Sequence, residues 1–293
     1  MSRLMLACRG EGQWGSREDD NAKIDLIFTM GHPWHPGERL LILCQVKSGA
    51  AYGAVLPKNT GFKLNGAAKA AARRSSHAIC LAWVDRASDR VFWAFLHPDT
   101  RPGPQEYGSN HEVSPAVRYD LARCMAGRRS GGAEGGRGVV LPEVSGDVAA
   151  RRAEAFRSYR QVREVQSPVL GSIEFTRLGW RHMFRRSRAA QNKNASVNLL
   201  PRLPVLLRES PSVVAITATE FSQHAGLTTR QCEYLLKYER VTARTKTGRL
   251  QPVTVHVRVI EEVRYPTDWY AKTMLTQRVS RRVVLKSAYY KAR

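Results

Sequence analysis

Two apolar runs near the start of the chain, residues 24–29 and 40–47, are separated by a turn rich in Gly and Pro. Runs of this length bounded by turn residues are typical of strands, so we expect them to pair as a hairpin with a wide, His-containing loop. An Ala-rich stretch at residues 66–76 predicts a helix. Residues 77–84 are apolar almost without a break and predict a strand buried on both faces, and residues 90–96 predict another. This order of elements indicates a mixed α/β fold.

The second half of the chain has a different pattern. A Gly-rich stretch at residues 127–150 predicts a linker. Three segments after it predict helices, the last of them interrupted by two prolines: residues 151–165, 178–190 and 196–208. Three further segments alternate between apolar and polar side chains and predict an antiparallel sheet: residues 233–245, 252–265 and 269–287. We therefore expect a first domain at residues 1–126 and a basic α+β domain at residues 151–293.

Charge is shared unevenly between these two halves. The chain has 293 residues, 43% of them apolar, which is enough to bury a core. Its formal net charge is +22, and residues 151–293 hold 28 Lys and Arg against 10 Asp and Glu, whereas residues 1–150 hold 19 against 15. A strongly basic surface is typical of proteins that bind a polyanion, so we expect nucleic acid as a partner. The alternative is a ribosome-like or merely solubilising basic surface.

Five cysteines are scattered along the chain, and no two have the spacing of metal ligands. An odd, scattered set indicates free thiols in a reducing compartment. The first residues lack the apolar core of a signal peptide, and no run reaches the roughly 18 apolar residues of a membrane span. We expect a cytoplasmic protein with no membrane partner.

Polar residues lie at one end of each of the first two apolar runs. Asp25 begins the first run, and Gln45 and Lys47 end the second. Since side chains alternate along a strand, Gln45 and Lys47 lie on the same face. A metal site that hydrolyses phosphodiesters needs oxygen ligands for a divalent cation and a cation near the attacking water, and the Val46 carbonyl could add a ligand. The alternative is that Asp25 forms a strand-end turn and that Lys47 ends a strand in solvent.

These residues carry a resemblance to a known family. Asp25, then Gln45-Val46-Lys47-Ser48-Gly49, and later strands with Trp83-Val84-Asp85 and Phe92-Trp93 resemble the restriction-endonuclease-like PD-(D/E)xK nucleases, in the branch with the motif D…QxK. Within that branch the chain is similar to the effector nuclease domain of short prokaryotic Argonaute systems and to Mrr-type enzymes. The similarity covers about residues 10–100.

The resemblance implies a PD-(D/E)xK-type mixed sheet with flanking helices and a Mg²⁺- or Mn²⁺-dependent endonuclease, with DNA the favoured substrate and prokaryotic defence the favoured role. It implies that Asp25 and Gln45 bind the metal with the Val46 carbonyl, and that Lys47 positions or activates the attacking water. It leaves open a homo-oligomer or a defence-system partner protein. Such domains usually take a further Glu from the first helix, and three acidic residues are candidates, the first of them best placed: Glu11, Glu18 and Asp20.

Residues 179–188 combine four Arg with aromatic side chains. Such a mixture can hold phosphates and stack on bases, which makes five residues candidates for nucleic-acid binding: Arg181, His182, Arg185, Arg186 and Arg188. The alternative is a basic helix that packs on its own core through Trp180, Met183 and Phe184, which share one helical face.

The second half also bears a weaker resemblance to the barnase, colicin and RelE-like ribonucleases, because helices precede an antiparallel sheet and basic and hydroxyl residues lie near the end of the chain. That resemblance implies a metal-independent ribonuclease with five candidate residues: Arg181, His182, Arg185, Lys286 and Ser287. A third alternative is a non-catalytic nucleic-acid-binding protein with a degenerate nuclease fold.

Overall fold

The chain divides into two compact units, and each is described by itself. The computed structural model describes residues 2–16, 18, 24–49, 53–56, 61–64, 70, 77–97, 105–129, 138–142, 146–245, 247–273 and 278–293. Unit 1 comprises Met1–Cys124 with Tyr265–Arg278, and unit 2 comprises Met125–Arg264 with Val279–Arg293. In the part of the chain that the structure describes, no helix has the length and apolar character to cross a membrane. All five cysteines are free thiols.

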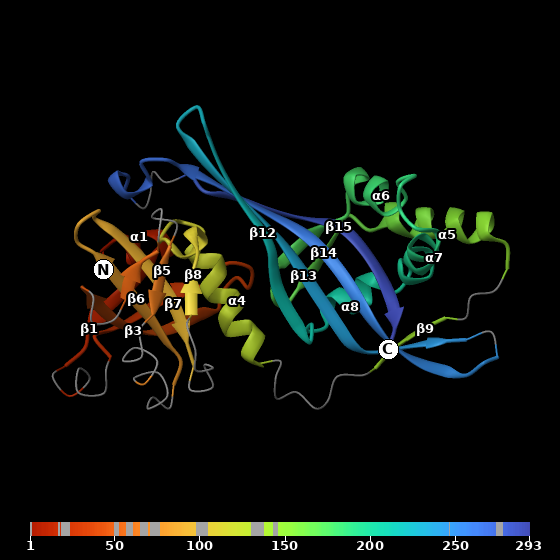
Figure 1. Ribbon diagram of the computed structural model, residues 1–293, viewed down its shortest axis with the longest axis horizontal. Coiled ribbons are helices and arrows are strands. Elements are labelled where there is room, and N and C mark those ends of the chain that lie inside the picture. Colours follow the sequence, from red (N-terminus) through yellow and green to blue (C-terminus); the bar gives the residue numbers. More distant parts are fainter. Residues whose placement is uncertain are drawn as a thin grey trace. The chain divides into compact units, whose positions relative to one another are not determined.

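A five-stranded mixed sheet forms the centre of unit 1 (Figure 1). Its strands, in spatial order, are β1 (Gly10–Trp14), β2 (Leu26–Gly31), β3 (Arg39–Ser48), β6 (Ile79–Asp85) and β7 (Arg90–Leu96). β3 and β6 run parallel, and the other neighbours run antiparallel. The four strands predicted for this half, and the hairpin of the first two, are therefore confirmed. The helix predicted at residues 66–76 lies outside the described residues except for position 70.

Alternation along the strands separates two faces of this sheet. Leu26, Phe28 and Met30 of β2 are buried and lie opposite buried residues of β3. On the other face, Leu81 and Trp83 pack with the small sheet of β4 (Gly53–Val55), β5 (Phe62–Leu64) and β8 (Gln105–Tyr107). The unit also contains α1 (Ser2–Cys8), the short helix η2 (Ser109–His111) and the first part of α4 (Val117–Arg129), as far as Cys124.

A segment from far along the sequence completes unit 1. The short helix η3 (Trp269–Ala271) lies between the last two strands of unit 2 in sequence and contacts α1. Trp269 is buried, and the Arg3 guanidinium lies 4.9 Å from the centre of the Tyr270 ring. The strand predicted at residues 269–287 is therefore wrong in its first part, since the chain forms η3 there and the strand begins at Ser280.

A half-barrel sheet of seven long and short strands dominates unit 2. Six of them follow in the order β10 (Glu164–Ser167), β11 (Gly171–Glu174), β15 (Ser280–Ala292), β14 (Leu250–Pro266), β13 (Leu227–Arg244) and β12 (Val213–His224). The seventh, β9 (Val139–Leu141), pairs parallel with β13. Because β9 and the start of α5 lie inside residues 127–150, part of the predicted linker is regular structure.

Four helices cover one face of this sheet (Figure 1). They are α5 (Val148–Gln161), α6 (Arg177–Met183), α7 (Ala190–Leu199) and α8 (Leu203–Arg208). The helices are shorter than predicted: α6 ends at Met183 rather than at residue 190, and the segment predicted at 196–208 is divided between α7 and α8. Pro204 lies in the first turn of α8, where its missing N–H costs nothing.

The hairpin of β12 and β13 was not predicted. Its turn consists of Ala225 and Gly226, with φ of 49° and 75°, and two positive φ values suit a tight two-residue hairpin turn. Most of β12 is exposed and so lacks an apolar alternation, which is the physical reason that the sequence does not indicate the strand.

Candidate functional site

Asp25 and Lys47 meet where β2 begins and β3 ends. The Asp25 N–H donates to the Cys44 carbonyl at 2.9 Å, which holds the backbone of Asp25 beside β3. The Asp25 carboxylate accepts a hydrogen bond from the Val46 N–H at 2.5 Å, and the Lys47 ammonium lies 3.5 Å from the same oxygen. The two side chains are only 16% and 18% exposed. The carboxylate is therefore fixed by both a backbone donor and a cation.

Gln45 lies on the same face of the sheet as Lys47. The pairing of β3 with β6 places Gln45 opposite Leu81 and Lys47 opposite Trp83, and the antiparallel register of β2 places Asp25 beside Gln45. Gln45 is 2% exposed, and its amide nitrogen is buried with no hydrogen-bond partner among the described residues. A buried amide without a partner is costly, so this group requires an explanation.

The donors at this site fit a hard divalent cation. Mg²⁺ prefers oxygen ligands and is often held by one or two carboxylates while it keeps water and phosphate ligands. Asp25 provides a carboxylate, and the Gln45 amide could turn its oxygen toward a cation. The N–H and C=O of one strand residue point toward the same neighbouring strand. Because the Val46 N–H points to Asp25, we expect the Val46 carbonyl on the Asp25 side as well. Within the described ranges no three His, Cys, Asp or Glu residues gather as a metal site, so these ligands form an open set rather than a closed cage.

Glu11 does not join this group. It lies on β1 opposite Thr29, its side chain is 83% exposed, and it forms an ion pair of 3.3 Å with Arg39. Four residues along β2 separate Thr29 from Asp25, which is about 13 Å. α1 contains no acidic residue, Glu18 is exposed, and Asp20 lies outside the described residues. The expectation that Glu11 completes the site is not supported, because its register on β1 places it too far along the sheet.

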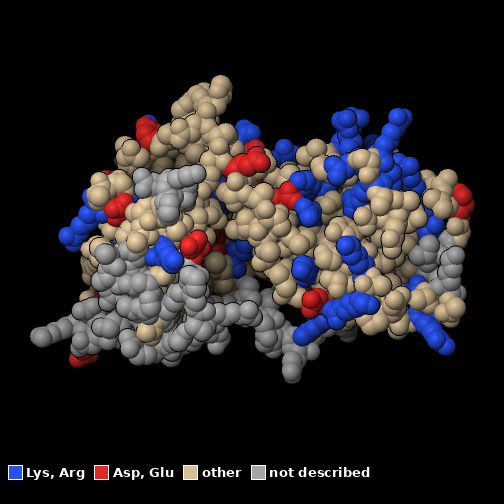
Figure 2. Space-filling model, in the orientation of Figure 1, with Lys and Arg blue, Asp and Glu red and all other residues tan. Residues whose placement is uncertain are grey.

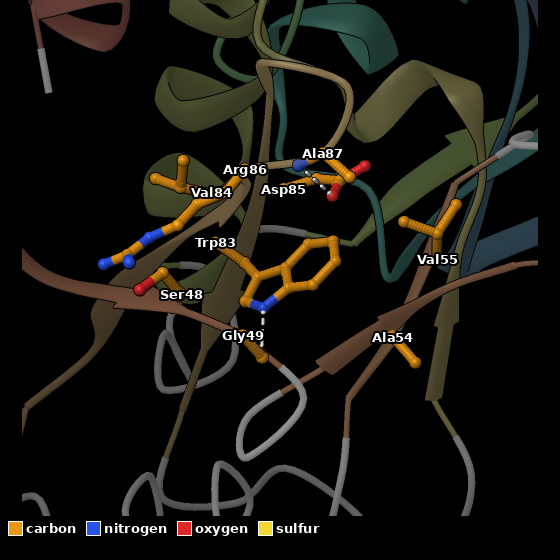
Figure 3. Close-up of a pocket in the computed structure, with 9 residues that line it drawn as sticks. All are labelled: Ser48, Gly49, Ala54, Val55, Trp83, Val84, Asp85, Arg86 and Ala87. Carbon is orange, nitrogen blue, oxygen red and sulfur yellow. Dashed lines mark hydrogen bonds between the residues drawn. The ribbon is translucent and has the colours of Figure 1, made fainter.

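A cavity of about 450 Å³ lies at the ends of β3 and β6, next in sequence to Lys47 (Figure 3). The Trp83 indole N–H donates to the Gly49 carbonyl at 3.0 Å and so forms part of the wall. Asp85 accepts from the Ala87 N–H at 3.2 Å and from the Ser88 hydroxyl, which makes it a turn residue. The cavity is lined by Ser48, Gly49, Ala54, Val55, Trp83, Val84, Asp85, Arg86 and Ala87. Of these, exposed Arg86 was not predicted as functional, although it follows a strand end directly.

Among the five residues predicted to bind nucleic acid in unit 2, Arg185 and Arg188 lie near His182, because their charges lower its pKa. Arg181 lines a cavity with Trp180, whereas Arg185 and Arg186 are exposed beyond the end of α6. The Arg188 guanidinium lies 5.2 Å from the centre of the Tyr289 ring. Met183 is buried, and Trp180 and Phe184 pack against the core with ring centres 4.2 Å apart. The packing role predicted for these three residues is therefore confirmed.

His182 and Arg185 belong to a cluster that also includes residues of the sheet. Partial burial lowers the pKa of His182, the nearby charges of Lys286 and Arg185 lower it further, and Glu233 opposes them. Glu233 accepts hydrogen bonds from Lys286 and, at 2.8 Å, from Arg258. Burial alone would raise the pKa of Glu233, but these two hydrogen bonds outweigh it and lower the pKa. The carboxylate is thus held ionised.

A register shift gives Lys286 its place in this cluster. Arg258 pairs with Ser287 and Val259 pairs with Leu285, so Lys286 is the extra residue of a β-bulge. Bulges redirect side chains, and here the bulge accompanies the contact of Lys286 with Glu233. Ser287, also a predicted candidate, is buried.

Comparison of the chain with protein-family models, with curated proteins and with solved structures found no match.

Proposed function

We propose that the chain is a metal-dependent nuclease that hydrolyses phosphodiester bonds of nucleic acid, with Asp25, Gln45 and Lys47 as its site. The observation that carries the proposal is the approach of the Lys47 ammonium to 3.5 Å from the Asp25 carboxylate, beside the buried amide of Gln45. Such a site needs oxygen ligands for a divalent cation and positive charge at the attacked phosphate, and these side chains supply both. The D…QxK resemblance supports the same assignment, and with it DNA as substrate and a role in prokaryotic defence.

Each residue has a separate part in this proposal. Asp25 and Gln45, with the Val46 carbonyl, would hold Mg²⁺ or Mn²⁺, which when bound supplies a Lewis acid for the phosphate oxygens. Lys47 orients the attacking water by donating to it, and its charge favours the negative charge that develops on the phosphate. Asp25 keeps Lys47 in position, and the Val46 N–H keeps Asp25 in position. Because both charged side chains are mostly shielded from solvent, their interaction with an anion is stronger than it would be at the surface.

The test is cleavage of plasmid and single-stranded substrates by the full chain with Mg²⁺ or with EDTA. We expect Lys47→Ala to reduce the cleavage rate at least about 100-fold, the size of effect that loss of a charge-stabilising donor produces. Lys63→Ala is the matched control, since Lys63 is an exposed lysine of the same unit with only a 3.8 Å ion pair to Glu106. Cleavage that persists in EDTA, or at the wild-type rate in Lys47→Ala, would refute the proposed site.

Metal binding gives a second measurement that does not depend on cleavage. A cation that binds only the folded chain raises its melting temperature in proportion to the logarithm of its concentration. We expect Mn²⁺ to stabilise the wild-type chain and to have a much smaller effect on Asp25→Asn, which loses the carboxylate that the described residues place at the site. Equal stabilisation of both proteins would exclude Asp25 as a ligand.

The cluster of His182, Glu233 and Lys286 favours a second candidate function, a metal-independent ribonuclease in unit 2. A histidine with a lowered pKa beside an ionised carboxylate and two cations could supply general acid–base catalysis and charge stabilisation. This candidate predicts RNA cleavage that survives EDTA and Lys47→Ala but is lost in His182→Ala. If His182→Ala cleaves RNA at the wild-type rate, the candidate is excluded.

A further inference from the structure

A groove between α5 and α6 combines exposed aromatic rings with arginines. Two cavities, each of about 640 Å³, adjoin each other at Phe156 and Trp180, which line both, and together they are called the groove here. This size is within the range of about 300–1,000 Å³ that is typical of sites for small organic molecules. The remaining lining residues are Asp147, Val148, Ala149, Arg152, Ala153, Tyr159, Arg160, Phe175, Thr176, Arg177 and Arg181.

The aromatic rings of Phe156 and Trp180 pack against neighbouring rings and are partly exposed. Phe156 is 38% exposed, and its ring centre lies 4.7 Å from that of Trp180 with a tilt of 56°. Trp180 is supported from the core side by Tyr159, whose ring centre is 5.6 Å away, and by Phe184 at 4.2 Å. A large ring held by its neighbours but open to solvent loses little entropy when a flat group stacks on it.

Arginines flank these rings on both helices. Arg152, Phe156 and Arg160 follow one another at intervals of four on α5, and Arg177 and Arg181 do the same on α6, so each set lies on one helical face. The Arg160 guanidinium lies 5.6 Å from the centre of the Phe156 ring. Along α5, arginine guanidinium groups therefore lie on both sides of the Phe156 ring.

The positive charge of the groove is not neutralised within the described part of the chain. None of the ion pairs formed by the described residues involves Arg160, Arg177 or Arg181, whereas arginines elsewhere in the unit, such as Arg258 and Arg282, are paired with carboxylates. The carboxylate among the lining residues, Asp147, caps α5 by accepting from the Ala150 N–H at 3.0 Å. Figure 2 shows Lys and Arg side chains gathered over the region where Figure 1 labels α5 and α6.

We infer that this groove binds single-stranded nucleic acid, with bases stacked on Phe156 and Trp180 and phosphates held by Arg160, Arg177 and Arg181. Single strands bind by this combination of aromatic stacking and a positive channel. In a duplex the bases are already stacked on each other, and an acidic peptide has no flat base to stack. The inference deepens the proposed nuclease function by naming the form of its substrate, and it rests on that function for the cleavage of the bound strand.

Binding is measured on the full chain in EDTA, so that no metal-dependent cleavage interferes. The probes are fluorescent single strands of thymidylate and of uridylate, the same DNA strand with abasic sites, and a DNA duplex, read by anisotropy. We expect the single strands to bind more tightly than the abasic strand and the duplex. Phe156→Leu keeps an apolar side chain but removes the ring, and we expect it to weaken binding of the thymidylate strand about 5- to 150-fold and binding of the abasic strand little. Equal losses for both strands, or none, would overturn the stacking role.

The arginines are tested by two variants of equal charge. One replaces Arg160, Arg177 and Arg181 with Gln, and its control replaces Arg157, Arg202 and Arg208, which are exposed in the same unit but do not line the groove. We expect the first variant to lower the slope of log affinity against log salt by about 2, since each phosphate contact on a single strand contributes about 0.7, and the control to lower it less. Equal effects would mean that net charge alone holds the strand, which would overturn the site.

Two further results separate this inference from its alternatives. Polyglutamate that competes as well as an oligonucleotide of equal charge would identify an acidic polypeptide as the ligand and overturn the inference. Lys63→Ala, which removes an exposed lysine of unit 1, is expected to bind single strands like the wild type. Binding that does not change in Phe156→Leu, together with Mg²⁺-dependent cleavage, would refute the groove alone, whereas binding that depends on Phe156 without any Mg²⁺-dependent cleavage would refute the nuclease site alone.

Discussion

Gln45 places an amide nitrogen where water does not reach it and where no described residue accepts its hydrogen bond. Leaving a buried polar group unsatisfied costs about 1–3 kcal/mol, which selection for stability would remove. Sites that bind a ligand are where such costs are retained. Other buried polar atoms of the described residues, such as Trp93 Nε1 and Tyr238 Oη, also lack a partner, so it is the position of Gln45 beside Asp25 that favours a functional reason for this residue.

Replacement of Gln45 by Met tests that reason at the scale of one residue. Met is apolar and of similar size, so we expect Gln45→Met to raise the free energy of unfolding by about 1 kcal/mol and to abolish Mn²⁺ stabilisation and cleavage. Urea unfolding monitored by circular dichroism measures the first effect. Leu43→Met, on the same strand, is the control and should cost less than about 1.5 kcal/mol. A clear loss of stability in Gln45→Met would show that the amide has a structural partner.

Glu233 predicts a pH dependence of stability. Its pKa is lowered in the folded chain by the hydrogen bonds of Lys286 and Arg258, although burial acts in the opposite direction. A lowered folded pKa stabilises the fold above the unfolded value, near 4.3 for Glu, and this stabilisation is lost as pH falls through the folded pKa. We expect Glu233→Gln to cost roughly 1 kcal/mol at pH 7 and to make stability less sensitive to acid below about pH 4.5.

Urea midpoints of the wild type and Glu233→Gln across the acid range measure this difference. The control is Glu154→Gln, since Glu154 is exposed on α5 and takes no part in the ion pairs formed by the described residues. The difference between wild type and Glu233→Gln should shrink as the pH falls. A constant difference across the range would mean that the ionisation of Glu233 does not stabilise the fold.

At the scale of elements, α6 approaches β15 more closely than any side chain would permit. A Cβ atom on Gly179 would lie 2.4 Å from the Leu285 carbonyl oxygen and 2.6 Å from the Tyr159 hydroxyl. The carbonyl belongs to the β15 backbone and cannot turn aside as a flexible side chain does. Gly179 therefore fixes the distance between α6 and the sheet, and with it the positions of Trp180 and Arg181 in the groove.

We expect Gly179→Ala to cost about 2–3 kcal/mol, since an added methyl group in a closely packed contact forces the backbone to move. Thermal unfolding of the full chain measures the loss, and binding of a single strand should weaken with it. Gly138→Ala is the control, because the nearest atom to an added Cβ there is 3.7 Å away. A change of less than about 0.5 kcal/mol in Gly179→Ala would contradict this account of the contact.

At the scale of the whole molecule, the two units are linked by more than one crossing of the chain. Tyr265–Arg278 is assigned to unit 1, while β14 and β15 on either side of it form the centre of the sheet in unit 2. Trp269 is buried within this segment, and η3 contacts α1. Unit 1 is therefore not a continuous piece of sequence, and a fragment that ends near residue 124 would lack part of its packing.

Trp269→Ala tests the contribution of this segment to unit 1. Removing a buried Trp typically costs about 3–5 kcal/mol, so we expect faster amide exchange in α1 and β1, with β13 little changed. Hydrogen exchange followed by mass spectrometry measures both units in one sample. Tyr270→Ala is the milder comparison, because Tyr270 is 54% exposed and loses mainly its contact with Arg3. Equal acceleration of amide exchange in both units would contradict the assignment of Trp269 to the packing of unit 1.

Local sequence was sufficient for the features of this protein that depend on neighbouring residues. Apolar runs of strand length predicted β2, β3, β6 and β7, and the period of two predicted that Gln45 and Lys47 lie on one face. The spacing of Trp180, Met183 and Phe184 likewise predicted a helical face that packs on the core. Each of these features is a matter of local geometry, because side-chain direction repeats with the period of the strand or helix.

Features that depend on pairing between distant segments emerged only in the folded chain. The register of β1 on β2 carried Glu11 away from Asp25, and hydrogen bonding in the sheet brought Asp25 to Val46 and Lys47. Likewise, α5 brought Phe156 and Arg160 to Arg181, whereas His182, the next residue, belongs to the cluster with Glu233. Strand register and helix docking are set by the free energy of the whole core, and no periodicity within a short segment contains that information.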